Sequence, residues 1–235
     1  MTQEKMQNPE SNESVNLGEI AVVLVAQSNN PSIINPDFLR HNEIVNADLA
    51  LQGDPITSPL FSQVTFERGI VVNALPDRVS FQQTGDSLAS GDILCPEIAK
   101  RYVEKVPHVP YSAIGVNPKG YRYLFDEVKE KVSNILIKSA ELSFRDVTPE
   151  VHLKTIYQYD TRKIVLDIAE ATMKKNNESE IPIILFQANI HRDLPSTMEQ
   201  QNRIKTISDI LTSWEDDLSD FNALIKKFNF QESKS

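Results

Sequence analysis

Short apolar segments in the N-terminal part of the chain predict β-strands separated by turns. A run of Ile, Val and Leu at 19–27 has the composition of a strand that is buried on both faces. Three alternating segments, each ending at a turn, lie at 61–66, 70–75 and 78–83. Gly69 stands where the first of these turns requires a positive φ angle. The pattern predicts an antiparallel meander of three strands.

The period of the apolar positions changes after residue 95. Ile98, Tyr102 and Val106 recur every fourth residue, which predicts a helix over 96–106. The pattern then predicts a strand, a turn at Asn-Pro-Lys-Gly and a second helix, at 111–116, 117–120 and 123–137.

The C-terminal part again places strands before a helix. The strands are predicted at 150–159, 163–173 and 181–192. A long helix is predicted over 196–229, because the apolar residues from Ile204 to Phe228 follow a spacing of three and four. Ser196 and Glu199 fit a capping box at its start. The acidic residues at 215–217 allow a kink or a break in this helix.

Strands that occur in runs favour antiparallel pairing over repeated βαβ units. We therefore predict an α+β fold, with antiparallel sheet built from two strand runs and packed by three helices, including the long C-terminal one. Whether the two runs form one sheet or two stays open. Residues 1–17 are polar and are expected to form a disordered tail, as are residues 231–235. A single domain is expected over 18–230, and a division into two subdomains near 108–140 stays open.

The segment His191-Arg192-Asp193-Leu194 matches the catalytic loop of protein kinases in four letters. A kinase requires an Asn four positions after that Leu, where this chain has Met198, and an Asp-Phe-Gly segment further on, which is missing. The sequence also has no Gly-rich loop that could cover phosphates. We therefore interpret the segment as the end of a strand.

In this strand the even positions from 184 to 190 are apolar, while the odd positions become polar. If the strand at 150–159 is its neighbour, six polar side chains share one face of the sheet: His152, Lys154, Gln187, Asn189, His191 and Asp193. Two interpretations stay open. The face is a binding surface, or it is the solvated face that antiparallel sheets commonly have.

The charge and the cysteine content exclude several other classes of function. A net charge of -9 disfavours nucleic-acid binding, which requires a positive surface. Cys95 is the only cysteine, so no disulfide within the chain and no cysteine zinc site can form. No cofactor motif and no metal-ligand spacing is present. Without a signal-peptide pattern or an apolar run long enough to span a bilayer, we expect a cytoplasmic protein that does not enter membranes.

Two segments carry a resemblance to a known family. They are Phe-Glu-Arg-Gly-Ile-Val-Val-Asn-Ala-Leu-Pro-Asp-Arg-Val-Ser-Phe at 66–81 and Tyr-Ser-Ala-Ile-Gly-Val-Asn-Pro-Lys-Gly-Tyr at 111–121. With a strand and a long closing helix after them, the chain resembles a sporadically distributed family of uncharacterised bacterial α+β proteins over 60–228. The matching motifs are Asp77-Arg78 and Gly115-Val116-Asn117. The resemblance implies a prokaryotic protein of unknown activity, with no catalytic residues to transfer.

Two hypotheses about function follow from these observations. The first is a non-enzymatic cytoplasmic protein that binds another protein or itself, as an accessory factor or a subunit of a larger complex. The alternative is an enzyme with an unrecognised site around His152, His191 and Asp193.

Overall fold

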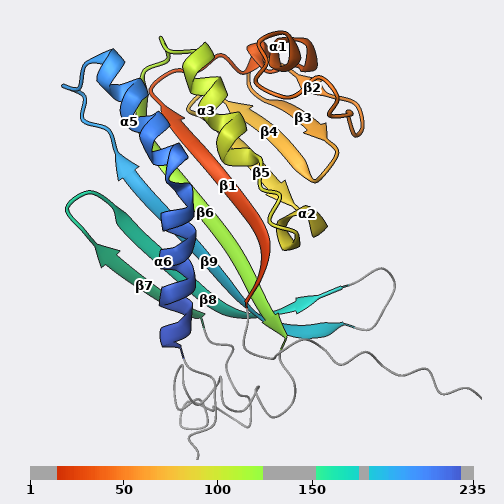
Figure 1. The fold of residues 1–235 in the computed structure, drawn as a ribbon, viewed down its shortest axis with the longest axis vertical. Helices are drawn as coiled ribbons and strands as arrows, with labels where there is room; N and C mark the ends of the chain where they lie inside the picture. The colour runs from red at the N-terminus through yellow and green to blue at the C-terminus, as the bar shows by residue number, and fades with distance from the viewer. Residues whose placement is uncertain (1–14, 124–151, 175–179, 229–235) are drawn as a thin grey trace, which may run out of the picture.

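Nine antiparallel strands form one continuous sheet in the computed structural model of the protein (Figure 1). The structure describes residues 15–123, 152–174 and 180–228. The strand order is β2-β3-β4-β5-β1-β6-β9-β8-β7. The two predicted strand runs therefore belong to one sheet, in which β1 (Asn16–Ala26) and β6 (Tyr111–Tyr123) lie side by side and join them.

The predicted meander is present with its predicted turns. Its strands are β3 (Ser62–Phe66), β4 (Ile70–Leu75) and β5 (Arg78–Thr84), and the short β2 (Ile56–Thr57) pairs with β3. Gly69 has a φ of 69°, and a Cβ atom there would lie 2.0 Å from the carbonyl oxygen of Thr84. Both the backbone angle and the close approach therefore require glycine at this turn.

The strands of the C-terminal run also lie where the pattern predicts them. They are β7 (His152–Gln158), β8 (Lys163–Met173) and β9 (Ile181–Asp193). Their order in the sheet differs from the expected one, because β8 pairs with both of the others. The assumption that the strand at 150–159 lies beside the strand at 181–192 was wrong. Consecutive strands joined by short turns pair with each other first, which places the middle strand of the three between its neighbours.

The turn predicted at 117–120 is not formed, because β6 continues through it. Lys119 and Gly120 pair with β9 on one side and with β1 on the other, so pairing on both sides holds the segment extended. The ladder between β6 and β9 omits Asn117 and Pro118, in agreement with the missing N–H group of proline. The local turn preference of Asn-Pro-Lys-Gly is thus overridden by tertiary pairing.

The prediction of three helices needs correction, since the described residues contain five α-helices and a short 3-10 helix. They are η1 (Pro31–Ile33), α1 (Pro36–His41), α2 (Asp86–Ala89), α3 (Cys95–Lys105), α5 (Gln200–Thr212) and α6 (Trp214–Lys227). The helix predicted over 96–106 is confirmed as α3. The helix predicted over 123–137 lies outside the described residues, except for Tyr123, which ends β6.

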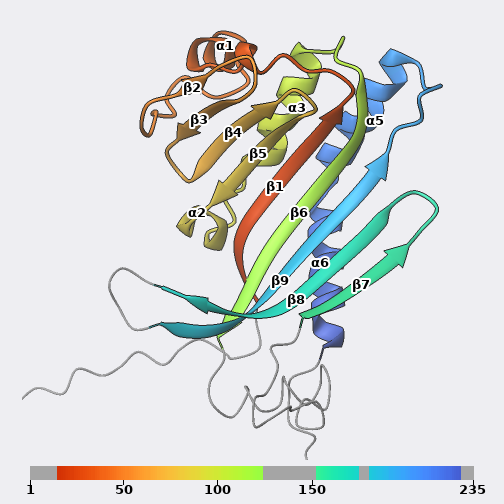
Figure 2. The same cartoon turned by 180° about the vertical axis from the view of Figure 1, so that it is seen from behind.

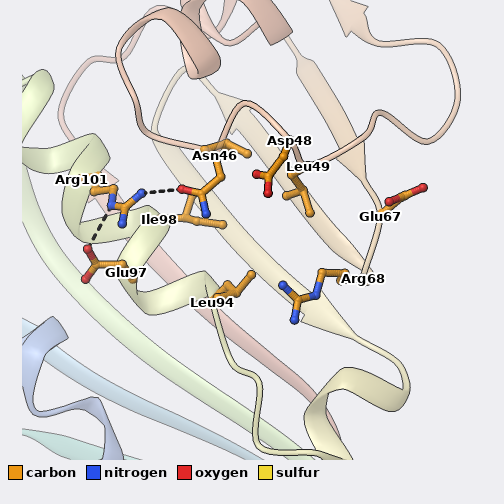
Figure 3. A pocket seen from close by; sticks show the side chains of 10 residues that line it. Asn46, Asp48, Leu49, Glu67, Arg68, Leu94, Glu97, Ile98 and Arg101 are labelled. Atoms are coloured by element: carbon orange, nitrogen blue, oxygen red, sulfur yellow. Dashed lines mark hydrogen bonds and ion pairs between the residues drawn. The ribbon is translucent and has the colours of Figure 1, made fainter.

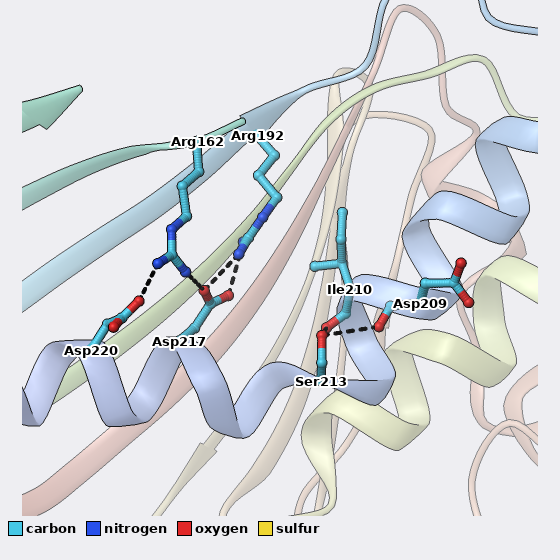
Figure 4. Close-up of polar contacts among 7 residues, drawn as sticks. All are labelled: Arg162, Arg192, Asp209, Ile210, Ser213, Asp217 and Asp220. Atoms are coloured by element: carbon cyan, nitrogen blue, oxygen red, sulfur yellow. Dashed lines mark hydrogen bonds and ion pairs between the residues drawn. The ribbon is translucent and has the colours of Figure 1, made fainter. Parts of the chain in front are cut away.

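The long C-terminal helix is broken at Ser213 and begins later than predicted. Its first piece starts at Gln200 without a side-chain cap, so the capping box of Ser196 and Glu199 is not formed. At the break, the Ser213 Oγ donates a hydrogen bond to the Asp209 carbonyl oxygen at 3.2 Å (Figure 4). The acidic residues 215–217 then form the first turn of α6, where the helix dipole favours negative charge. They start a second helix.

Two clusters of buried apolar residues lie between the sheet and its helices. The larger cluster packs β1 and β3–β6 against α1, α3 and α5, with Val22, Phe81 and Tyr102 among its members. The smaller cluster packs β8 and β9 against α6 and contains Ile164, Leu166, Ile168, Ile184, Phe186, Ala188, Ile190, Phe221, Leu224 and Ile225. All of these helices lie on the same side of the sheet.

Candidate functional site

The other face of the sheet is not covered by any described helix, and we call it the open face. In Figure 2 the strands β1, β6, β9 and β8 lie in front of α5 and α6. Along β9 the buried residues Phe186, Ala188 and Ile190 alternate with the exposed residues Gln187 and Asn189, as the period-two pattern predicts.

All six predicted side chains belong to the open face. In β7, His152 and Lys154 alternate with residues that face the smaller cluster, and the register aligns Lys154 with Asp167 of β8 and then with Gln187 of β9. Asn189, His191 and Asp193 follow at every second position of β9. The structure therefore places the six on one face, but with β8 between the β7 pair and the β9 group.

A row of alternating charges crosses the open face at Gln187. It consists of Lys154, Asp167, Gln187, Lys119 and Glu19, which are aligned across β7, β8, β9, β6 and β1. The Lys154 Nζ lies 3.6 Å from the Asp167 Oδ1, and the Lys119 Nζ lies 4.0 Å from the Glu19 Oε2. Opposite charges directly across strands stabilise a sheet modestly. The row thus gives the open face both signs of charge at short intervals.

A ladder of side-chain amides crosses the opposite part of the open face. The Gln63 Nε2 donates to the Asn73 Oδ1 at 2.8 Å, and the Asn73 Nδ2 donates to the Gln82 Oε1 at 3.1 Å. These residues come from β3, β4 and β5. They are not among the residues predicted from the sequence to form a site, although each occupies an outward position of the alternating meander.

A glycine and two asparagines lie near the charge row on the open face, in β6 and β9. A Cβ atom on Gly115 of β6 would lie 3.2 Å from the Asn117 Oδ1 and 3.8 Å from the Asn189 Oδ1. The Asn117 Oδ1 is buried and accepts no hydrogen bond from the described residues. The open face is therefore low at Gly115, beside an acceptor that is buried and receives no hydrogen bond from the described residues.

His191 and Asp193 are close together, whereas His152 is distant from both. The His191 Nε2 lies 3.0 Å from the Asp193 Oδ1. His191 is aligned with Lys163 of β8, and His152 is aligned with Ala169 of the same strand. These two positions are six residues apart along β8, which corresponds to about 20 Å. The structure does not bring the three residues of the enzyme hypothesis into one site.

Arg192 leaves the strand on the opposite face and forms a buried ion cluster with α6. Its guanidinium donates to both carboxylate oxygens of Asp217, at 2.6 Å and 2.8 Å (Figure 4). Arg162, from the turn between β7 and β8, donates to Asp217 at 2.8 Å and also pairs with Asp220. Only 1% of the Asp217 side chain is exposed. His191-Arg192-Asp193 is thus a strand end whose arginine has a structural partner.

Cys95 is buried at the start of α3 and is not placed for nucleophilic chemistry. Burial raises the pKa of its thiol, which donates to the Ile20 carbonyl oxygen. The N–H groups of Leu94 and Cys95 donate to the side-chain oxygen of the buried Gln83, at 2.7 Å and 3.2 Å. The amides that could have stabilised a thiolate therefore bind Gln83 instead.

The cavity in Figure 3 lies between α3 and the loop before β2 and has a volume of about 220 Å³. Its apolar side includes Leu49, Leu94 and Ile98. On its polar side Arg101 donates to the Glu97 Oε1 at 3.0 Å and to the Asn46 Oδ1 at 3.1 Å. No sequence pattern predicts this cavity, since its lining residues come from separate segments of the chain and form no motif. The charged groups of Arg101 and Glu97 satisfy each other.

The comparisons with known proteins add no identification. No protein-family model and no curated protein matches the chain. Within the described residues, no group of three or more His, Cys, Asp or Glu side chains could hold a metal ion, and no helix is long and apolar enough to cross a membrane.

Proposed function

We propose that this protein is a non-enzymatic, cytoplasmic binding protein that contacts another protein through its open face, as an accessory factor or subunit of a larger complex. The observation that carries the proposal is the alignment of the six predicted polar side chains on a face that no described helix covers. The nearby charge row and amide ladder extend that polar surface across the sheet.

The dimensions of the open face suit a protein partner better than a small ligand. Nine strands spaced by about 4.8 Å span about 38 Å, and six residues of strand length add about 20 Å in the other direction. The product, about 800 Å², is an upper bound, because β2 has only two residues, and it is comparable with the area that each partner contributes to a standard protein interface. None of the six residues lines the cavity in Figure 3 or three further cavities, although Glu19 and Lys119 of the charge row line one of these.

The charges of the open face indicate the chemistry of the partner. Lys154, Asp167, Lys119 and Glu19 alternate in sign, so a uniformly acidic or basic surface would meet repulsion at every second position. A partner with mixed charges and side-chain amides fits this pattern. Complementary alternation would fix the register of the complex more than its affinity.

Site-specific photocrosslinking tests the proposal. A photoreactive residue at the exposed Gln187 of β9 should capture the partner in cells, whereas one at the exposed Asn222 of α6 should not. With the captured partner purified, Gln187→Arg should weaken binding by at least about tenfold, because it adds a second cation beside Lys119. Asn222→Arg is the matched control on the helix side. Equal losses from both variants, or capture only at Asn222, would contradict the proposal.

One contact favours the enzyme alternative, namely the hydrogen bond between His191 and Asp193. A histidine oriented by a carboxylate is a common arrangement for a general base. An enzyme centred on this pair would bind a small ligand that raises the melting temperature of the wild type but not of His191→Ala. If the open face instead binds a protein, His191→Ala should weaken the binding of that protein, and no small ligand should raise the melting temperature of the wild type.

A further inference from the structure

The two edges of the sheet differ in length and regularity. On one side the sheet ends at β2, which has two residues. On the other side β7 is the last strand among the described residues, and its seven residues pair with β8 without a register shift. β7 contains neither proline nor glycine. A regular strand of this length at an edge presents a row of backbone N–H and C=O groups that can pair with another strand.

Apolar side chains gather at this edge on both faces of the sheet. Ile156, on the open face, is 58% exposed, and Tyr159, just after the strand, is 47% exposed. On the helix side, Leu153 and Tyr157 are half-buried at the rim of the smaller cluster. The smaller cluster is therefore not closed at β7 by the described residues.

We propose that β7 pairs antiparallel with β7 of a second copy of this chain, so that two sheets become one continuous sheet. The proposal concerns an edge and leaves the open face free, so it does not depend on the proposed function. It would place the open faces of two copies side by side as one surface with twofold symmetry.

The sequence of β7 complements itself in one register that pairs all seven residues. With Thr155 opposite its own copy, Leu153 lies opposite Tyr157 and both complete the smaller cluster. On the open face Lys154 lies opposite Ile156, and His152 lies opposite Gln158. No two like charges are directly opposite, and Lys154 is also paired with Asp167 of its own chain at 3.6 Å. A second copy is favoured as the occupant because it brings its own Leu153 and Tyr157 to the unclosed rim of the smaller cluster.

A pair of charge variants tests the register. Sedimentation equilibrium of the full chain should show a dimer. Ile156→Lys should raise the dimer dissociation constant by at least about tenfold, because each Lys would lie opposite Lys154 of the other chain. Ile156→Glu removes the same apolar side chain but places a carboxylate opposite that lysine, and should keep the dimer. A monomeric wild type, or equal effects of the two variants, would overturn the proposal.

Covalent trapping gives an independent measurement. The double variant His152→Cys with Gln158→Cys should form a disulfide-linked dimer on mild oxidation, because each new cysteine lies opposite the other type in the second chain. Either single variant is the matched control, because identical positions would be about 20 Å apart across the pair. The native Cys95 is buried and does not compete. Equally fast crosslinking of a single variant would overturn the register, and so would a double variant that stays uncrosslinked.

Discussion

The two halves of the sheet are joined to their helices by different kinds of contact. In the half formed by β1 and β3–β6, the larger cluster packs against several helices, and its members come from strands and helices alike. In the half formed by β7, β8 and β9, the smaller cluster packs against α6 alone among the described helices. That same helix also carries Asp217, which binds Arg192 of β9 and Arg162 of the turn between β7 and β8.

This difference shows that apolar area and buried charge have separate roles in the fold. Apolar contacts stabilise in proportion to the area they bury and specify orientation weakly. The ion cluster has directional requirements, because Arg192 donates to both oxygens of one carboxylate, and Arg162 must reach the same group. We infer that the smaller half, with less apolar area, depends on Asp217 to set the position of α6.

The largest effect is expected from Asp217→Ala. The substitution would leave the guanidinium groups of Arg162 and Arg192 without their buried acceptor, and breaking a buried pair costs about 3–5 kcal/mol of unfolding free energy. Asp220→Ala is the control, since its side chain is 39% exposed and an exposed pair contributes about 0–1 kcal/mol. Urea denaturation of the two variants measures the difference. Similar losses of unfolding free energy in the two variants would show that the buried carboxylate of Asp217 stabilises the smaller half no more than an exposed carboxylate does.

The next largest expected effect is a loss of unfolding free energy at alkaline pH, caused by two tyrosines of the larger half. Burial raises the pKa of the hydroxyl groups of Tyr102 and Tyr111, both of which lie in the larger cluster. An unfolded tyrosine ionises near pH 10, so above about pH 10 the unfolded chain loses protons that the folded chain keeps. Below this pH both groups are protonated in the folded and the unfolded chain and add no pH dependence, whereas above it the free energy of unfolding falls as the pH rises.

Two such groups give a loss of up to about 3 kcal/mol of unfolding free energy for each pH unit above about pH 10. Urea denaturation at several pH values measures the slope, and phenolate absorbance of the folded protein should show that these two side chains remain protonated. Tyr102→Phe should halve their share of the slope. If both tyrosines ionise in the folded protein, the larger half is more open to water than its packing indicates.

The sequence predicted those parts of the fold that local patterns determine. Strands β3–β5, β8 and β9 lie within one or two residues of their predicted bounds, because alternation between turns defines a half-buried strand. The shared face of Gln187, Asn189, His191 and Asp193 follows from the same period. His152 and Lys154 lie on that face as well, but two strands away from β9.

The parts that the sequence did not predict depend on contacts between distant segments. The place of β8 between β7 and β9, and the extension of β6 through Pro118, are set by pairing partners. The ion cluster joins residues 55 positions apart, yet two local signals could have indicated it. Arg192 occupies an inward position of β9, and Asp217 lies between Trp214 and Phe221 on the apolar stripe of the last helix. Because an unpaired buried charge is costly, an arginine and an aspartate at two inward positions are expected to pair with each other.

The smallest expected effect is a difference in unfolding free energy between variants that remove one of two buried tyrosine hydroxyl groups of the larger half. The Tyr111 hydroxyl donates to the Val106 carbonyl oxygen at 3.2 Å, whereas the Tyr102 hydroxyl is buried without a hydrogen-bond partner among the described residues. Removing a satisfied hydrogen bond costs about 1 kcal/mol, so Tyr111→Phe should lower the unfolding free energy by that amount.

Tyr102→Phe should instead leave the stability near neutral pH unchanged or raise it by up to about 1 kcal/mol, because it removes a polar group whose burial is not compensated. The ring and its contact with Phe81, at 5.4 Å between centroids, would stay in place. The same urea experiments measure both variants. A loss in Tyr102→Phe as large as that in Tyr111→Phe would mean that the Tyr102 hydroxyl binds an internal water. The stability of the larger half would then depend on buried polar contacts as well as on apolar area. In this respect it would resemble the smaller half, which depends on Asp217.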